Sequence, residues 1–130
     1  MNESITRQEL LREGPFMIIK INQLYREGMP AEELYEITRG YWRLNVEHAR
    51  KAAYVLSVAH GTVVEVYMPK EWYPAGTTKM PFRDAPRDPD HRYEFTGEIA
   101  PEKIRNEFLG RSVKELFSKG CAAPVTYFGI

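Results

Sequence analysis

The sequence predicts an α+β fold, a single small mixed β-barrel flanked by helices, and three observations support this. A chain of 130 residues with 43% hydrophobic content can bury one core, which favours one domain. Along the chain, the apolar pattern changes repeatedly between the two-residue period of strands and the longer period of helices. The resulting order is strand, helix, short helix, hairpin, long loop, strand, two helices and strand, which fits a partly closed barrel of five or six strands.

The N-terminal part is predicted to be a polar leader followed by the first strand. Residues 1–15 are mostly charged or polar, so the domain itself is expected at 16–130. Residues 16–22 are rich in β-branched side chains and form the expected strand. Its alternation places three apolar residues on one face: Met17, Ile19 and Ile21. Lys20 and Asn22 lie together on the opposite face at the end of this strand, where both side chains could line a pocket.

Residues 30–42 are predicted to form the main helix. Pro30 suits a first helical turn, and two acids follow it where the positive end of the helix dipole lies. Four apolar residues then recur at helical spacing: Leu34, Ile37, Tyr41 and Leu44. Asn45 is a good N-cap for a second, shorter helix.

Two strands at 54–59 and 62–68 are predicted to form a hairpin. The dipeptide His60-Gly61 suits its tight turn, and Pro69 is expected to stop the second strand. The expected core residues come from several elements: Ile19, Ile21, Leu34, Ile37, Val55, Val64, Val66, Phe95, Leu116 and Phe117.

A long loop at 74–90 is predicted from its prolines, glycine and alternating charges. Because it offers little apolar surface, we expect it to be the most mobile internal segment and able to close over a ligand. The remaining elements are expected as a strand at 92–99, helices at 101–109 and 112–117, and a strand at 124–128.

Composition restricts the possible partners. The 18 basic and 18 acidic residues cancel, so any binding of nucleic acid must come from a local basic patch. The single cysteine, Cys121, excludes an internal disulfide, suits a reducing cytosol and is expected to be a small buried filler. The three histidines lack metal-ligand spacing, so no metal and no cofactor is predicted. No bilayer-spanning run or signal peptide is visible, which predicts a cytoplasmic protein without a membrane partner.

Basic and aromatic residues provide the candidate site, which is predicted to lie between the 30–42 helix and the barrel. A cation beside an aromatic face can hold a phosphate and a base together, and an amide can pair with a base edge. The predicted nucleic-acid-binding residues are Lys20, Asn22, Arg39, Trp42, Arg43, Trp72, Tyr73 and Arg92. The competing interpretation makes Trp42 a core anchor and lets Trp72 and Tyr73 seal an edge of the core, with the helix arginines paired with neighbours such as Glu36 or Glu47.

Several segments resemble a group of small bacterial and phage-associated proteins that occur alone or beside nuclease modules. The segments are ELYEITRGYWRLN, AYVLSVAHGTVVEVY, EWYPA, RYEFTGEIA and a closing part with GRSV and PVTY, spanning about 18–127. By element order, this group is similar to the PUA-like barrels, which include the ASCH and EVE domains. The resemblance implies a barrel with a cleft that binds RNA or a modified base in DNA. The zero net charge departs from a typical RNA-binding barrel.

Non-catalytic recognition is the favoured function, and two alternatives stay open. No carboxylate pair, nucleophile–base pair or phosphate loop occurs at diagnostic spacing. The first alternative is a protein-interaction or regulatory module without a nucleotide pocket, with a nuclease module as a protein partner. The second follows from the resemblance: an ASCH-type ribonuclease that cleaves RNA without metal through Lys20, Arg92 and a tyrosine.

Overall fold

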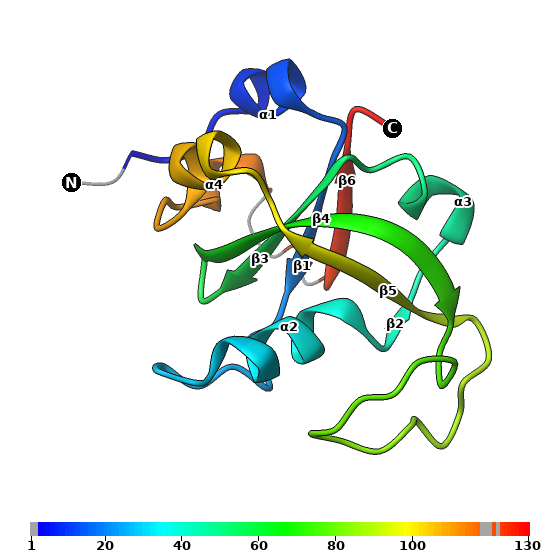
Figure 1. Ribbon diagram of the computed structural model, residues 1–130. Coiled ribbons are helices and arrows are strands. Elements are labelled where there is room, and N and C mark those ends of the chain that lie inside the picture. The colour runs from blue at the N-terminus through cyan, green and yellow to red at the C-terminus, as the bar shows by residue number, and fades with distance from the viewer. Residues whose placement is uncertain (1–2, 118–120, 122) are drawn as a thin grey trace.

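The computed structural model describes residues 3–117, 121 and 123–130. In this part of the chain, six strands form one mixed sheet that curls into a nearly closed barrel, and four α-helices accompany it (Figure 1). The α+β class predicted from the sequence is therefore confirmed. In chain order, the elements are α1 (Arg7–Glu13), β1 (Phe16–Lys20), α2 (Ala31–Arg39), β2 (Trp42–Arg43), α3 (Val46–Ala49), β3 (Tyr54–Ala59), β4 (Thr62–Pro74), β5 (Arg92–Ile99), α4 (Glu102–Phe108), the 3₁₀ helix η1 (Lys114–Leu116) and β6 (Val125–Phe128).

The strand order is β2-β5-β4-β3-β1-β6, so the barrel has its seam between β2 and β6. The β1–β3 pair is parallel, and the other neighbours are antiparallel. Side chains bridge the seam: the Tyr127 hydroxyl on β6 donates to the Asn45 carbonyl at 3.4 Å, and the Tyr127 ring meets His48 edge-on at 5.6 Å. Side-chain contacts therefore help to close the barrel at its seam.

The alternation of β1 places two hydrophobic clusters on opposite faces of the sheet. The interior cluster contains the predicted face of β1 together with residues from α2, β4 and β5: Met17, Ile19, Ile21, Ile37, Trp72 and Phe95. The outer cluster joins β1 to α1 and α4: Ile5, Leu10, Phe16, Ile18, Ile104 and Phe108. In Figure 1, α2 lies on the opposite side of the sheet from α1 and α4. Residues 1–15, expected as a leader, thus contribute two fully buried side chains to the core, Ile5 and Leu10.

Most of the predicted core is buried. Six of its members are buried: Ile19, Ile21, Ile37, Val55, Val66 and Phe95. The others are half-buried and pack against the two clusters from their margins: Leu34, Val64, Leu116 and Phe117. The expected helix at 112–117 is only the 3₁₀ turn η1.

The main helix is shorter than predicted, because α2 ends at Arg39 and Trp42 belongs to strand β2. Gly40 follows the helix at a place where the backbone packs tightly against β5. A Cβ atom on Gly40 would lie 2.9 Å from the Met80 Cε and 3.0 Å from the Glu94 Cβ, so only glycine fits without a shift. The chain then pairs with β5, with Trp42 opposite Tyr93.

Strand β4 is longer than predicted, because it continues through Pro69 to Pro74. The register with β5 shifts between Pro69 and Glu71, which is a bulge where a proline is tolerated. Gly97 on β5 permits this approach, since a Cβ atom there would lie 2.4 Å from the Met68 carbonyl oxygen. Trp72 and Tyr73 are therefore inside a strand instead of at its rim.

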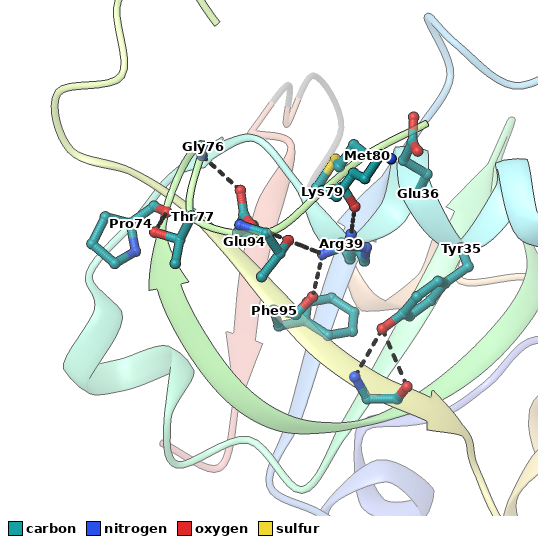
Figure 2. A network of polar contacts seen from close by, with 12 residues as sticks. Tyr35, Glu36, Arg39, Pro74, Gly76, Thr77, Lys79, Met80, Glu94 and Phe95 are labelled. Carbon is teal, nitrogen blue, oxygen red and sulfur yellow. Dashed lines mark hydrogen bonds and ion pairs between the residues drawn. The ribbon is translucent and has the colours of Figure 1, made fainter. Parts of the chain in front are cut away.

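Buried carboxylates anchor the first half of the 75–91 loop (Figure 2). The Glu94 carboxylate accepts hydrogen bonds from the backbone N–H of Gly76 at 2.8 Å and of Thr78 at 2.7 Å. Glu36 Oε1 accepts one from the Phe82 N–H at 3.0 Å. Polar contacts thus hold a segment that has little apolar surface of its own. No helix within the described residues is long and apolar enough to cross a lipid bilayer.

Candidate functional site

A pocket of about 560 Å³ opens at the barrel seam. Its volume is within the range of about 300–1,000 Å³ that small-molecule sites occupy. Four of the eight predicted binding residues line it: Lys20, Asn22, Trp42 and Arg92.

The curled sheet brings these four residues together from distant parts of the chain. Lys20 is the last residue of β1, and Asn22 follows it by two positions. Arg92 is the first residue of β5, and Trp42 lies on β2, which pairs with that end of β5. The C-terminal end of α2 contributes Ile37, so the pocket lies between this helix and the barrel.

Two cations in the pocket are held by hydrogen bonds to backbone carbonyl groups. The Lys20 Nζ donates to the Cys121 carbonyl at 3.1 Å and lies 4.1 Å from the centre of the Phe117 ring. The Arg92 Nη1 donates to the Tyr41 carbonyl at 3.0 Å. Among the described residues, no carboxylate forms an ion pair with either side chain. Their positive charge is therefore available to attract an anion.

Arg83 and Tyr41 complete the wall of the pocket. The Arg83 guanidinium carbon lies 4.5 Å from the centre of the Tyr41 ring, and its Nη2 donates to the Glu36 carbonyl at 3.0 Å. The Arg83 Nε is 4.0 Å from the Glu36 Oε2, and neither atom has a hydrogen-bond partner among the described residues. Burial lowers the pKa of Arg83, which still remains a cation at neutral pH. Burial, aided by the negative charge of Glu94, raises the pKa of Tyr41.

The charge of this pocket differs from that of the whole chain. Three cations line it, Lys20, Arg83 and Arg92, and no described acidic residue does. A second cavity of about 240 Å³, between α2, β4 and β5, shows the opposite distribution. No described lysine or arginine lines this second cavity. Three glutamates do: Glu32, Glu65 and Glu98. An anionic ligand is thus favoured only in the first of these two cavities.

The structure places Arg39 outside the pocket, in a buried network (Figure 2). Its guanidinium donates to the Thr78 hydroxyl at 2.8 Å, the Lys79 carbonyl at 2.9 Å and the Phe95 carbonyl at 3.1 Å. Its side chain is only 8% exposed, and Glu94 lies 4.0 Å away. Arg39 therefore connects α2 to β5 and to the 75–91 loop, and it is not accessible to a phosphate.

Three further predicted residues also lie outside the pocket. Arg43 is exposed and pairs with Asp88 at 2.6 Å instead of with Glu47. Trp72 is 4% exposed and its ring lies 5.1 Å from that of Phe95, because β4 continues past Pro69 into the interior. Tyr73 is half-buried next to it on β4. Trp72 thus packs in the core, in the interior cluster with Phe95.

Sequence reasoning missed Tyr41 and Arg83 as site residues. Tyr41 was assigned to the buried stripe of the helix, but α2 ends before it. Arg83 stands among alternating charges in a loop, so nothing local distinguishes it from its neighbours. Cys121, expected to be buried, is exposed at the pocket wall.

No protein-family model, no curated protein and no solved structure matches this chain. Within the described residues, no three histidine, cysteine, aspartate or glutamate side chains are grouped so as to hold a metal ion.

Proposed function

We propose that this chain is a nucleic-acid-interacting domain that binds a base of RNA or DNA, including a modified base, in the pocket at the barrel seam, without catalysis. One observation carries the proposal. In a chain of zero net charge, the pocket combines aromatic rings with three cations and no described acidic residue.

The lining residues suit the two parts of a nucleotide. The rings of Trp42 and Tyr41 provide flat surfaces for a base, and such stacking contributes about 1–3 kcal/mol per base. The ammonium of Lys20 and the guanidinium of Arg92 provide charge-assisted hydrogen bonds for a phosphate. A base inside an intact duplex cannot reach a concave pocket, so we expect single strands to bind more tightly than duplexes.

The pocket is better suited to binding than to turnover. The ribonuclease alternative is supported by one observation, which is that Lys20, Arg92 and a tyrosine, Tyr41, line the same pocket. RNA cleavage also needs a general base with a pKa near the working pH. No described aspartate, glutamate or histidine, which are common general bases, lines the pocket, and burial raises the pKa of Tyr41. Intact RNA after prolonged incubation is the expected result.

The fold is compatible with the proposed relationship to PUA-like barrels, since it is mixed, nearly closed and flanked by helices. A protein-interaction role is the second candidate function. It is favoured by the smaller cavity, where Leu34 and Tyr35 form an apolar wall beside Ile99, which is 48% exposed. A nuclease module is the kind of protein partner that the sequence resemblance implies.

A binding screen with paired variants tests the proposal. The full chain is titrated at low salt with single-stranded RNA, single-stranded DNA and duplexes that carry modified bases. We expect Trp42→Ala to weaken binding by about tenfold, which is the loss of one stacking partner. The control is Arg43→Ala, which removes a neighbouring cation outside the pocket and should leave binding unchanged. Absence of binding to every oligonucleotide, or equal affinity in the Trp42 variant, would reject the proposal.

A further inference from the structure

We infer that the pocket selects bases that carry a carbonyl oxygen where adenine and cytosine carry an amino group, and that Asn22 helps to determine this preference. The selected class comprises guanine, hypoxanthine, uracil and thymine. The inference rests on the proposed function, because it specifies which bases the same pocket accepts.

Several hydrogen-bond acceptors at the pocket wall are already occupied from within the protein. The Asn22 Oδ1 accepts from the His60 N–H at 2.7 Å. The Tyr41 carbonyl accepts from Arg92, and the Cys121 carbonyl accepts from Lys20. The same holds for the carbonyl groups of Ile21 and Pro124, which accept from the N–H of Tyr25 at 3.0 Å and of Lys20 at 2.8 Å. Each of these oxygens thus has at most one of its two lone pairs left for a ligand.

The donors at the same wall keep unused hydrogen atoms. An ammonium has three N–H groups, and Lys20 uses one of them on Cys121. A guanidinium has five, and Arg92 uses two, through Nε and Nη1, among the described residues. Gln23 and the Tyr41 hydroxyl can either donate or accept, so they do not alter the balance. Among the described side chains that line the pocket, unused N–H groups therefore outnumber unused acceptors.

The orientation of the Asn22 amide follows from its contact with the hairpin turn. A backbone N–H can be accepted only by the oxygen of an amide, so the contact with the His60 N–H identifies Oδ1. His60, with a φ of 51°, lies in the tight turn between β3 and β4, so this hydrogen bond fixes the Asn22 amide against the hairpin turn. The Asn22 Nδ2, with two N–H groups and no hydrogen-bond partner among the described residues, is consequently left for a ligand.

Base edges differ in the property that this pocket selects. Guanine presents two acceptors, N7 and O6, and thymine or uracil presents O4, whereas adenine presents an amino group at N6 and cytosine one at N4. A donor of the pocket that faces an amino group leaves both groups without a partner. A correctly paired base edge typically improves discrimination by about tenfold or more.

Two pairs of nucleotides isolate this single difference. The full chain is titrated with inosine and adenosine monophosphates and with uridine and cytidine monophosphates, up to millimolar concentration, by calorimetry. Each pair differs only in the carbonyl or amino position and its adjacent ring nitrogen. We expect the carbonyl member of each pair to bind about tenfold more tightly.

Asn22→Asp tests the role of the amide with an almost isosteric change. The aspartate keeps an oxygen for the His60 N–H, but it replaces the donor Nδ2 by an acceptor. The ratio of affinities within a pair should fall toward one or below it. Because both members carry the same phosphate, the ratio is insensitive to the added negative charge. Asn106→Asp, the same change at an exposed position on α4 outside the pocket, should leave the ratio unchanged.

Failure of this inference can be distinguished from failure of the proposed function. If no oligonucleotide binds, the proposed function is wrong, and the inference is wrong with it. If oligonucleotides bind, three results of the nucleotide titrations would overturn the inference alone. These are equal binding of all four nucleotides, no binding of any of them, or tighter binding of the amino member of a pair. If Asn22→Asp still prefers the carbonyl member of each pair by the same ratio, Asn22 does not determine the preference.

Discussion

Arg39 of α2 and Glu94 of β5 face each other in the interior, with the Arg39 Nη1 4.0 Å from the Glu94 Oε2. Both also bind Thr78, so the pair holds the start of the 75–91 loop against the barrel (Figure 2). The same loop carries Arg83 to the wall of the pocket. A buried ion pair thus connects the packing of α2 to the composition of the candidate site.

We predict that Arg39→Met lowers the free energy of unfolding by about 3–5 kcal/mol, because it leaves Glu94 buried without its cation. Arg43→Met is the matched control, since it breaks an exposed pair with Asp88, which solvent screens, and it should change the free energy of unfolding far less. Urea unfolding of the two variants measures the difference. Equal destabilisation would contradict the structural role assigned to Arg39.

The two tryptophans should separate into a structural and a binding residue. Trp72→Ala removes a ring that is 4% exposed and packs against Phe95, so we expect a loss of about 3–5 kcal/mol in the free energy of unfolding. Trp42 is only half-buried at the pocket wall, so Trp42→Ala should destabilise the fold less and weaken ligand binding more. A Trp72 variant with unchanged stability would show that this ring is not a core anchor.

Hydrogen exchange should divide the 75–91 loop into two parts. The backbone N–H groups of Gly76, Thr78 and Phe82 bind buried carboxylates, so they should exchange slowly. The backbone N–H groups of Asp84, Ala85 and Arg87 have no described hydrogen-bond acceptor and should exchange quickly. Uniformly fast exchange across the loop would support the sequence-based expectation of a fully mobile segment.

The stability of the fold should decrease at alkaline pH. Burial raises the pKa of Tyr67 above its ordinary value of about 10. Below about pH 10 the phenol is neutral in both states, and its contribution is fully present. At higher pH the unfolded chain loses the proton while the folded chain keeps it, so the free energy of unfolding falls by up to about 1.4 kcal/mol per pH unit.

Urea unfolding at pH 9 and pH 11 tests this linkage. Tyr67→Phe should reduce the alkaline loss of stability. It should not abolish the loss, because burial raises the pKa of Tyr41 and Tyr127 as well. An identical pH dependence in the variant and the wild type would rule out Tyr67 as a contributor.

The fold class and several element bounds could be predicted because strong local patterns determine them. Strands β3 and β5 have the predicted bounds, since clear alternation is delimited by a tight turn or by a loop. The end of α2 and the length of β4 could not be predicted. They depend on close contacts, with side chains at Gly40 and with backbone at Gly97, which form only in the packed structure.

Half of the predicted site residues line the pocket, and local sequence patterns account for two of them. Lys20 and Arg92 stand at strand ends, where side chains gather at openings of a barrel. Arg39 and Trp72 have the same chemistry, but tertiary packing buries them. Arg83 reaches the pocket only because distant carboxylates anchor its loop, and no local pattern reports that contact.

The salt dependence of single-strand binding tests most directly the claim that a few pocket cations, in a neutral chain, hold a phosphate. Each neutralised phosphate of a single strand contributes about −0.7 to the slope of log K against log salt concentration, so the cations Lys20, Arg83 and Arg92 predict a slope no steeper than about −2. Lys20→Gln and Arg92→Gln should each reduce the slope by about 0.7, and Arg43→Gln should leave it unchanged. A much steeper slope, or one that neither pocket variant changes, would place nucleic-acid binding elsewhere on the surface and contradict the account.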